Sequence, residues 1–197
     1  MMTGHYSGVR TSLFHACNPD SFDSIENTGI EAATGFETPP TDGDSYVLPE
    51  NVAVEDAFGY ATTVVEYALA QERPGGMPSH DQAVFFFASE ERAASFGREG
   101  VAIIDGNSVA DKYDVYAGEY DLIEQLFLDT MRDFEIGYRS SLERVHKGAD
   151  EYWDTVRKVD IQTADLDDSE VFIPTTQLSS EYVVSTRRFV ELGYSPR

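Results

Sequence analysis

The sequence has little cysteine, little lysine and no long apolar run. Cys17 is the only cysteine among 197 residues, which excludes an intrachain disulfide and a metal site built mainly from thiolates. No apolar stretch approaches the roughly 20 residues that a membrane-spanning helix needs. Residues 1–30 lack the pattern of a signal peptide. We therefore expect a protein that stays dissolved in the compartment where it is made.

Basic residues are scarce in this chain. It has 14 Lys and Arg against 36 Asp and Glu, which gives a formal net charge of -22. Binding to duplex nucleic acid depends on clustered Lys and Arg, and the largest basic patch is Arg187-Arg188, so duplex nucleic acid is not the expected partner. No membrane partner is expected either.

Acidic residues are spread along the whole chain, with Asp165, Asp167 and Asp168 as the densest cluster. Such a surface repels itself at ordinary salt, whereas in molar salt the screening length falls to about 3 Å. We predict a halophilic origin, with the cytoplasm of a halophile or a virion as the expected location. An ordinary acidic cytosolic protein is the alternative.

The pattern of apolar residues predicts one α+β domain over 1–197, with short strands separated by helices and loops. Residues 1–9 are expected to form a loose arm. Residues 31–51 are rich in Thr, Pro, Gly and Asp and are expected to form a long surface loop, either a cover over a site or a variable insertion. Expected helices cover 18–29, 54–72, 89–97, 120–134 and 141–159. Expected strands cover 10–16, 83–88, 101–104, 170–173 and 182–185.

Two ionisable residues lie in apolar strand-like runs near opposite ends of the chain. His15 follows Leu13 and Phe14, and Glu181 precedes the run that ends at Val184. Desolvation of an ionisable group costs free energy, so such a group is often retained because it meets a ligand. The simpler interpretation is a structural histidine and a solvated glutamate at a strand end. We take the pair as the leading site hypothesis.

Two other types of site chemistry receive little support. The remaining histidines have no spacing relation to His15 or to carboxylates that would predict a metal site. Cys17 could act as a nucleophile with His15 as its base, but catalytic Cys and His pairs normally come from distant segments of the chain. We expect no metal and no cysteine nucleophile.

Three short segments together suggest a family. The first is Leu13-Phe14-His15-Ala16 with the following helix and Gly29-Ile30; the second is Ala83–Ser89 running into a helix; the third extends from Phe172 through Glu181 to Val184. In this order they resemble the ADP-ribosyltransferase superfamily. In that family the first strand carries a His, a middle strand carries an aromatic residue followed by a small residue and a helix, and a late strand begins with a catalytic Glu.

The resemblance implies a split sheet of short antiparallel strands with flanking helices, and NAD as the substrate. His15 corresponds to the histidine that hydrogen-bonds the adenosine-side ribose, and Phe86 to a tyrosine that stacks on nicotinamide. Ala16 and Ser89 are expected to line the same NAD site. Glu181 corresponds to the catalytic carboxylate, which favours an oxocarbenium-like transition state at the nicotinamide ribose. The implied activity is mono-ADP-ribosylation of a macromolecular acceptor.

The chain departs from the family pattern at several positions. Phe86 lacks the tyrosine hydroxyl, and Ala16 stands where many members have Gly. Ser179 stands where members that modify side chains often carry Glu or Gln, so the acceptor stays open. The alternative is a non-catalytic structural or interaction protein on a degenerate form of the same fold, for example a component of a halophilic virus. A role as toxin, regulator or virion component stays open too.

Overall fold

The computed structural model describes residues 11–34, 36–50, 52–53, 56–96 and 98–193. The expected arm at 1–9 lies outside these residues. Six α-helices lie in the described part of the chain: α1 (Phe22–Thr28), α2 (Ala57–Glu72), α3 (Glu90–Ser95), α4 (Gly106–Ala110), α5 (Tyr120–Gly137) and α6 (Leu142–Trp153). Short 3-10 helices include η1 (Pro19–Ser21), η3 (His80–Gln82), η4 (Ser180–Tyr182) and η5 (Phe189–Leu192).

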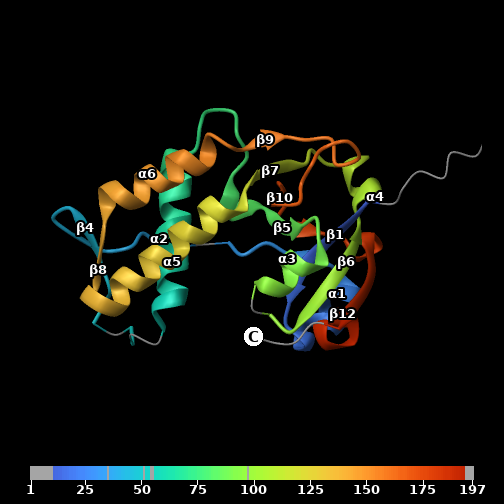
Figure 1. Ribbon diagram of the computed structural model, residues 1–197, viewed down its shortest axis with the longest axis horizontal. Coiled ribbons are helices and arrows are strands. Elements are labelled where there is room, and N and C mark those ends of the chain that lie inside the picture. Colours follow the sequence, from blue (N-terminus) through green and yellow to red (C-terminus); the bar gives the residue numbers. More distant parts are fainter. Residues whose placement is uncertain (1–10, 35, 51, 54–55, 97, 194–197) are drawn as a thin grey trace, which may run out of the picture.

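A seven-stranded sheet in the order β12-β6-β1-β5-β10-β7-β9 forms the centre of the fold, and every neighbouring pair is antiparallel (Figure 1). Its strands are β1 (Ser12–Cys17), β5 (Val84–Phe87), β6 (Gly100–Asp105), β7 (Tyr116–Glu119), β9 (Arg157–Lys158), β10 (Ser169–Ile173) and β12 (Val183–Arg188). The antiparallel sheet and its helices confirm the predicted α+β class.

Two smaller sheets complete the structure. One pairs β2 (Ile30–Glu31) with β11 (Gln177–Leu178). The other has the order β3-β4-β8 and consists of β3 (Thr41–Asp42), β4 (Ser45–Val47) and β8 (Arg139–Ser141).

Strand alternation divides the core into two clusters, one on each face of the central sheet. Phe85 and Phe87 point to the cluster that includes residues of α2, α5 and α6, whereas Phe86 points to the cluster that includes residues of α1 and α4. The three consecutive phenylalanines thus alternate between the two faces, as residues of a strand do. Figure 1 shows α2, α5 and α6 grouped at one end of the molecule, with β1, β6, β12 and α1 at the other.

The central sheet is weakly joined between β1 and β5. β1 pairs with β6 along its whole length, from Ser12 to Cys17, but shares with β5 the single register pair Phe14–Phe87. The strands therefore stop pairing beyond Phe14, at the position of His15. The sheet consists of two halves that meet at one residue pair.

The segment after β1 folds as its sequence predicts. A proline at the first position of η1 and the following α1 form the expected helix, which ends at Gly29. Gly29 has φ 96 and ψ -164, a backbone conformation that is essentially restricted to glycine. A Cβ atom there would collide with the carbonyl oxygen of Leu178. The glycine thus lets the end of α1 pack against β11.

Several expectations need correction. Residues 31–51 are more structured than predicted, because the chain turns at Gly43 and the resulting β3-β4 hairpin pairs with β8 in the helical part of the molecule. The predicted helix over 141–159 ends at Trp153, since the chain then turns into β9. Of the last two predicted strands, β12 is an edge strand, whereas β10 lies between β5 and β7.

Candidate functional site

His15 lies where the two halves of the sheet separate. Its Nδ1 is 2.8 Å from the carbonyl oxygen of Phe85 on β5, so the imidazole bridges the strands beyond their last register pair. A carbonyl oxygen only accepts hydrogen bonds, so Nδ1 carries a proton and donates it. The other ring nitrogen, Nε2, is then an acceptor in the neutral form.

The surroundings of His15 favour this neutral form. Desolvation lowers the pKa of His15 below 6.5, and the nearby positive charge of Arg98 lowers it further, although the hydrogen bond to Phe85 acts in the opposite direction. At neutral pH the residue therefore offers an unprotonated Nε2 that suits a hydroxyl donor. Burial also raises the pKa of the Cys17 thiol to about 11, so this thiol is protonated and a poor nucleophile.

Phe86 adjoins His15 but is not open to a ligand. The two ring centroids are 5.9 Å apart in an edge-on arrangement, which brings these two predicted site residues together. Phe86 is 0% exposed. Its ring therefore has no free face on which nicotinamide could stack, and its visible role is to support the imidazole from within the core.

Ala16 and Ser89 have local structural roles in this arrangement. Ala16 follows His15 on β1 and is half-buried. Ser89 is the N-cap of α3, and its hydroxyl accepts the backbone N–H of Arg92 at 3.2 Å. That hydroxyl oxygen is thus already engaged at the end of β5.

The structure does not place Glu181 beside His15. Glu181 lies in η4, before β12 begins, and its side chain is 63% exposed with Oε1 3.8 Å from Nζ of Lys112. Along the ladder, the residue in register with His15 through Ala102 is Thr186. Glu181 is thus a solvated charge on the far side of β6 from β1, and its assignment as the catalytic carboxylate stays a prediction.

Another glutamate lies on the other half of the sheet, and its side chain points to the face opposite to that of His15. Glu170 stands near the start of β10, which pairs directly with β5, and its register partner is Phe87. Since Phe87 also pairs with Phe14, these three residues form a row across β10, β5 and β1. Adjacent strands lie about 4.8 Å apart, so the backbone of Glu170 is roughly 10 Å from that of Phe14. The side chain of Glu170 is 11% exposed.

The carboxylate of Glu170 is held on one side. Its Oε1 accepts a hydrogen bond from the hydroxyl of Tyr152 at 2.9 Å and lies 3.2 Å from Nε2 of His80. Both contacts use the same oxygen atom. The second oxygen, Oε2, is used by neither of them.

An exposed aromatic ring lies at the end of α3, next to this row. Phe96 is 45% exposed, and its ring centroid is 5.8 Å from that of Phe87. Phe87 in turn packs edge-on against Tyr120 at 5.1 Å. Phe96 therefore offers an accessible ring face near Glu170, which Phe86 does not.

A signal for Glu170 was available in the sequence. It precedes Val171, Phe172 and Ile173, so it is an ionisable residue at the start of an apolar run, as Glu181 is. The acidic residues just before it made it look like the end of a solvated stretch. Phe96 had no comparable signal, because its exposure depends on how α3 packs.

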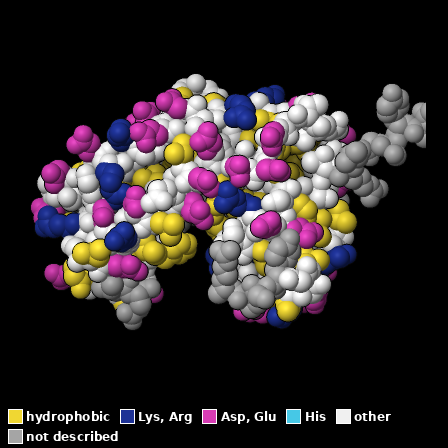
Figure 2. All heavy atoms as spheres, in the orientation of Figure 1, with side chains coloured by type: hydrophobic (Ala, Val, Ile, Leu, Met, Phe, Trp, Pro, Cys, Tyr) yellow, Lys and Arg dark blue, Asp and Glu magenta, His cyan; other side chains and the backbone are white. Residues whose placement is uncertain are grey.

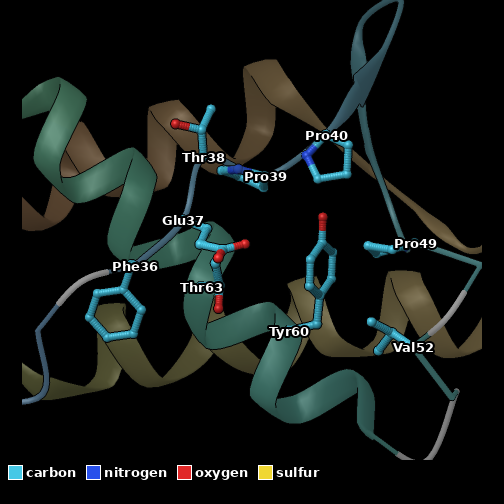
Figure 3. A pocket seen from close by; sticks show the side chains of 9 residues that line it. All are labelled: Phe36, Glu37, Thr38, Pro39, Pro40, Pro49, Val52, Tyr60 and Thr63. Atoms are coloured by element: carbon cyan, nitrogen blue, oxygen red, sulfur yellow. The ribbon is translucent and has the colours of Figure 1, made fainter.

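A separate pocket lies between the segment that precedes α2 and α2 itself. It has a volume of about 390 Å³. Figure 3 shows the ring of Tyr60 between Pro40 and Val52, and the Tyr60 hydroxyl donates to the carbonyl of Val47 at 2.9 Å. The lining residues are Phe36, Glu37, Thr38, Pro39, Pro40, Pro49, Val52, Tyr60 and Thr63. None of these is a predicted site residue.

The described residues contain no membrane-spanning or metal-binding arrangement. No helix among them has the length and apolar character needed to cross a bilayer. No group of three or more His, Cys, Asp or Glu side chains among them is arranged to hold a metal ion.

Comparison of the chain with protein-family models, with curated proteins and with solved structures finds no match.

Proposed function

We propose that this chain binds NAD across the β1, β5 and β10 strands and transfers ADP-ribose to a macromolecular acceptor. The observation that carries the proposal is the position of Glu170: a carboxylate at the start of a late strand, two strands from His15 and in register with the pair that joins the sheet halves. The resemblance implies a catalytic glutamate at the start of a late strand. Glu170 lies within β10, which pairs with β5, whereas Glu181 lies before the edge strand β12.

His15 and Arg98 suit the adenosine half of NAD. The unprotonated Nε2 of His15 is an acceptor for a ribose hydroxyl. Arg98 is an exposed residue close enough to lower the pKa of His15. In a chain of net charge -22, a guanidinium beside the ribose contact gives the pyrophosphate of NAD a local positive partner.

Glu170 suits the nicotinamide half. The side chains of His15 and Glu170 point to opposite faces of the sheet. One NAD molecule, with two riboses joined by the pyrophosphate, therefore reaches both only through the opening where β1 and β5 stop pairing beyond Phe14. The Glu170 carboxylate accepts a hydrogen bond from a hydroxyl of the nicotinamide ribose through Oε2, since Oε1 is held by Tyr152 and His80. This negative charge stabilises the positive charge that develops on the ribose ring in the transition state.

Phe96 takes the stacking role in place of Phe86. Its exposed ring, next to Phe87, offers a planar apolar surface for the nicotinamide ring. Phe86 instead packs edge-on against the imidazole of His15 on the buried side of that ring.

In the reaction the bond between C1 of the ribose and the nicotinamide nitrogen breaks, and nicotinamide leaves with the electron pair. A nucleophilic atom of the acceptor forms the new bond to C1 and loses its proton to solvent. Glu170 remains a carboxylate throughout. Water as the acceptor gives free ADP-ribose, so NAD hydrolysis is a simple readout of the same chemistry.

A second candidate is a non-catalytic interaction protein on the same fold. Two observations favour it: Phe86 is completely buried, and the Glu170 carboxylate already lies against His80. This candidate predicts a folded protein that neither binds nor cleaves NAD.

The experiment that separates the two candidates uses the purified chain in molar KCl. Calorimetry measures NAD binding, and chromatography measures nicotinamide release. We expect binding and slow nicotinamide release. A folded chain that shows neither contradicts the proposed function and favours the interaction protein.

A further inference from the structure

Glu170 belongs to a buried cluster of four polar side chains on the face of the sheet covered by α2 and α6. Glu66 comes from α2, His80 from η3, Tyr152 from α6 and Glu170 from β10. His80 Nδ1 is 2.9 Å from Glu66 Oε2, and His80 Nε2 is 3.2 Å from Glu170 Oε1. One imidazole thus links α2 to the strand that carries the proposed catalytic carboxylate.

The geometry of the cluster requires a charged histidine. Carboxylate oxygens only accept hydrogen bonds, so a ring that faces one with each nitrogen donates from both and is an imidazolium. Desolvation by itself disfavours the charged ring, but the carboxylates of Glu66 and Glu170 outweigh it and raise the pKa of His80 to about 10. Tyr152 is the remaining titratable member of the cluster, and burial keeps it protonated by raising its pKa.

Aromatic rings hold His80 in place. Its ring centroid is 4.4 Å from Phe85, and Tyr152 and Trp153 lie edge-on at 5.7 and 6.3 Å. His80 is 3% exposed, so it does not touch a ligand bound at Phe96 or His15. Any effect of His80 on catalysis must therefore pass through Glu170.

We propose that His80, oriented by Glu66, is a positioning residue that fixes Oε1 of Glu170 and leaves Oε2 for the nicotinamide ribose. This inference rests on the proposed function. A buried ion pair alone is weak support for a stabilising role, because desolvation of its charges offsets much of their attraction. A role in aiming a carboxylate gives this cluster a function that apolar side chains could not provide.

The chain offers a matched control in His146. Its Nδ1 is 2.7 Å from Glu72 on α2, and its Nε2 is 2.7 Å from the hydroxyl of Tyr46. This histidine also links a glutamate of α2 to a tyrosine, but it is half-exposed and does not contact β10 residues in these bonds. His146→Gln should leave NAD cleavage unchanged.

The kinetic test compares wild type, His80→Gln, Glu66→Gln and His146→Gln in NAD cleavage. Loss of a charge-assisted hydrogen bond at Glu170 should lower kcat in His80→Gln by about 10- to 100-fold, whereas KM for NAD should change little because His80 does not contact NAD. Glu66→Gln keeps the imidazole but removes one of its carboxylates. In wild type, kcat should fall at high pH as His80 loses its proton. Without the Glu66 carboxylate the pKa of His80 is lower, so in Glu66→Gln this fall in kcat should begin at a lower pH.

An NMR titration of the His80 ring provides a readout that does not depend on activity and also covers the case in which His80→Gln fails to fold. Glu66→Gln and Glu170→Gln should each lower the pKa of His80, and His146→Gln should not. If wild type cleaves NAD but His80 titrates near 6.5, or if both His80→Gln and Glu66→Gln keep the wild-type kcat and pH profile, the positioning role is overturned. A wild-type chain that cleaves no NAD overturns the proposed function, and the titration then decides whether the ion cluster exists.

Discussion

At the scale of single residues, exposure separates two phenylalanines that the sequence could not distinguish. Phe86 is completely buried next to His15, and Phe96 is 45% exposed next to Phe87. A buried ring contributes to stability through packing, while an exposed ring is available to a ligand. The two residues should therefore respond differently to truncation.

Phe86→Ala should lower the free energy of unfolding by about 3–5 kcal/mol, because it leaves a cavity in the core. Phe96→Ala should cost less than about 1 kcal/mol in stability. Stacking on an aromatic ring contributes about 1–3 kcal/mol to binding, so Phe96→Ala should weaken NAD binding by about 5- to 150-fold. Denaturant titration and calorimetry measure the two effects. Unchanged NAD affinity in Phe96→Ala contradicts the assignment of the stacking ring.

Buried His80 and half-buried His15 predict how stability depends on pH. The pKa of His80 is raised to about 10 in the folded protein, so its contribution is fully present below 6.5 and is lost as the pH rises through about 10. The pKa of His15 is lowered, so its effect is the opposite: stability falls as the pH drops below 6.5, because the unfolded chain then binds an additional proton.

Denaturant titrations at constant KCl should therefore show a free energy of unfolding that declines between pH 6.5 and about 10. His80→Gln should remove this decline and destabilise the protein by about 3 kcal/mol at neutral pH, because it leaves two buried carboxylates without their counter-charge. A flat profile in wild type over this interval contradicts the assignment of His80 as an imidazolium.

At the scale of elements, the join between α1 and β11 depends on one glycine. Gly29 has a backbone conformation that other residues rarely adopt, and a Cβ atom would meet the backbone of Leu178. Gly43, in the β3-β4 turn, also has positive φ but has no atom within 4 Å of an added Cβ. Substitution at Gly43 therefore introduces backbone strain alone, whereas substitution at Gly29 introduces both backbone strain and a collision.

Gly43→Ala should cost about 1 kcal/mol from backbone strain alone. Gly29→Ala should cost more than about 2 kcal/mol, since the strained backbone and the collision with β11 add. For a protein of this size 1 kcal/mol corresponds to about 2–4 °C in Tm, so thermal unfolding resolves the difference. Equal effects of the two substitutions contradict the described packing of α1 against β11.

The longer elements were predictable from the sequence because their signals are local. Helical spacing of apolar residues indicates α2 and α5, and the serine cap indicates the start of α3. The two-residue strands β3 and β11 carry no comparable signal, since their pairing partners β4 and β2 define them. Residues 31–51 were therefore expected to form an irregular loop.

The candidate site was predictable only in part, for a related reason. His15 has a local signal, an ionisable residue within an apolar run. The choice between Glu170 and Glu181 depends on which late strand lies next to β5, and strand order is a property of the whole sheet. β10 takes that place and β12 takes the edge, which no spacing in the sequence indicates.

At the scale of the whole molecule, the acidic surface is the dominant feature. Figure 2 shows Asp and Glu side chains over much of the visible face, with Lys and Arg between them. Several carboxylates pair with Arg or Lys on the surface, for example Asp133 with Arg144 at 2.6 Å. With 36 acidic against 14 basic residues, most acidic side chains have no basic residue to pair with, and repulsion among them is strong at low salt.

Stability should therefore rise with KCl. Screening shortens the range of repulsion from about 10 Å at 0.1 M salt to about 3 Å at molar salt, and we expect Tm to rise by about 10 °C, which corresponds to about 3 kcal/mol. Sucrose, which does not screen charge, is the control for general effects of cosolutes. A Tm that stays constant in KCl, or rises equally in sucrose, contradicts the predicted halophilic adaptation.

We have proposed that Glu170, hydrogen-bonded by Tyr152 and His80, is the carboxylate that promotes cleavage of NAD. The most direct measurement is the rate of nicotinamide release by wild type, Glu170→Gln and Glu181→Gln in molar KCl, with folding checked by circular dichroism. We predict that Glu181→Gln releases nicotinamide at the wild-type rate and that Glu170→Gln is at least about 100-fold slower. A folded Glu170→Gln variant that keeps the wild-type rate would contradict the claim.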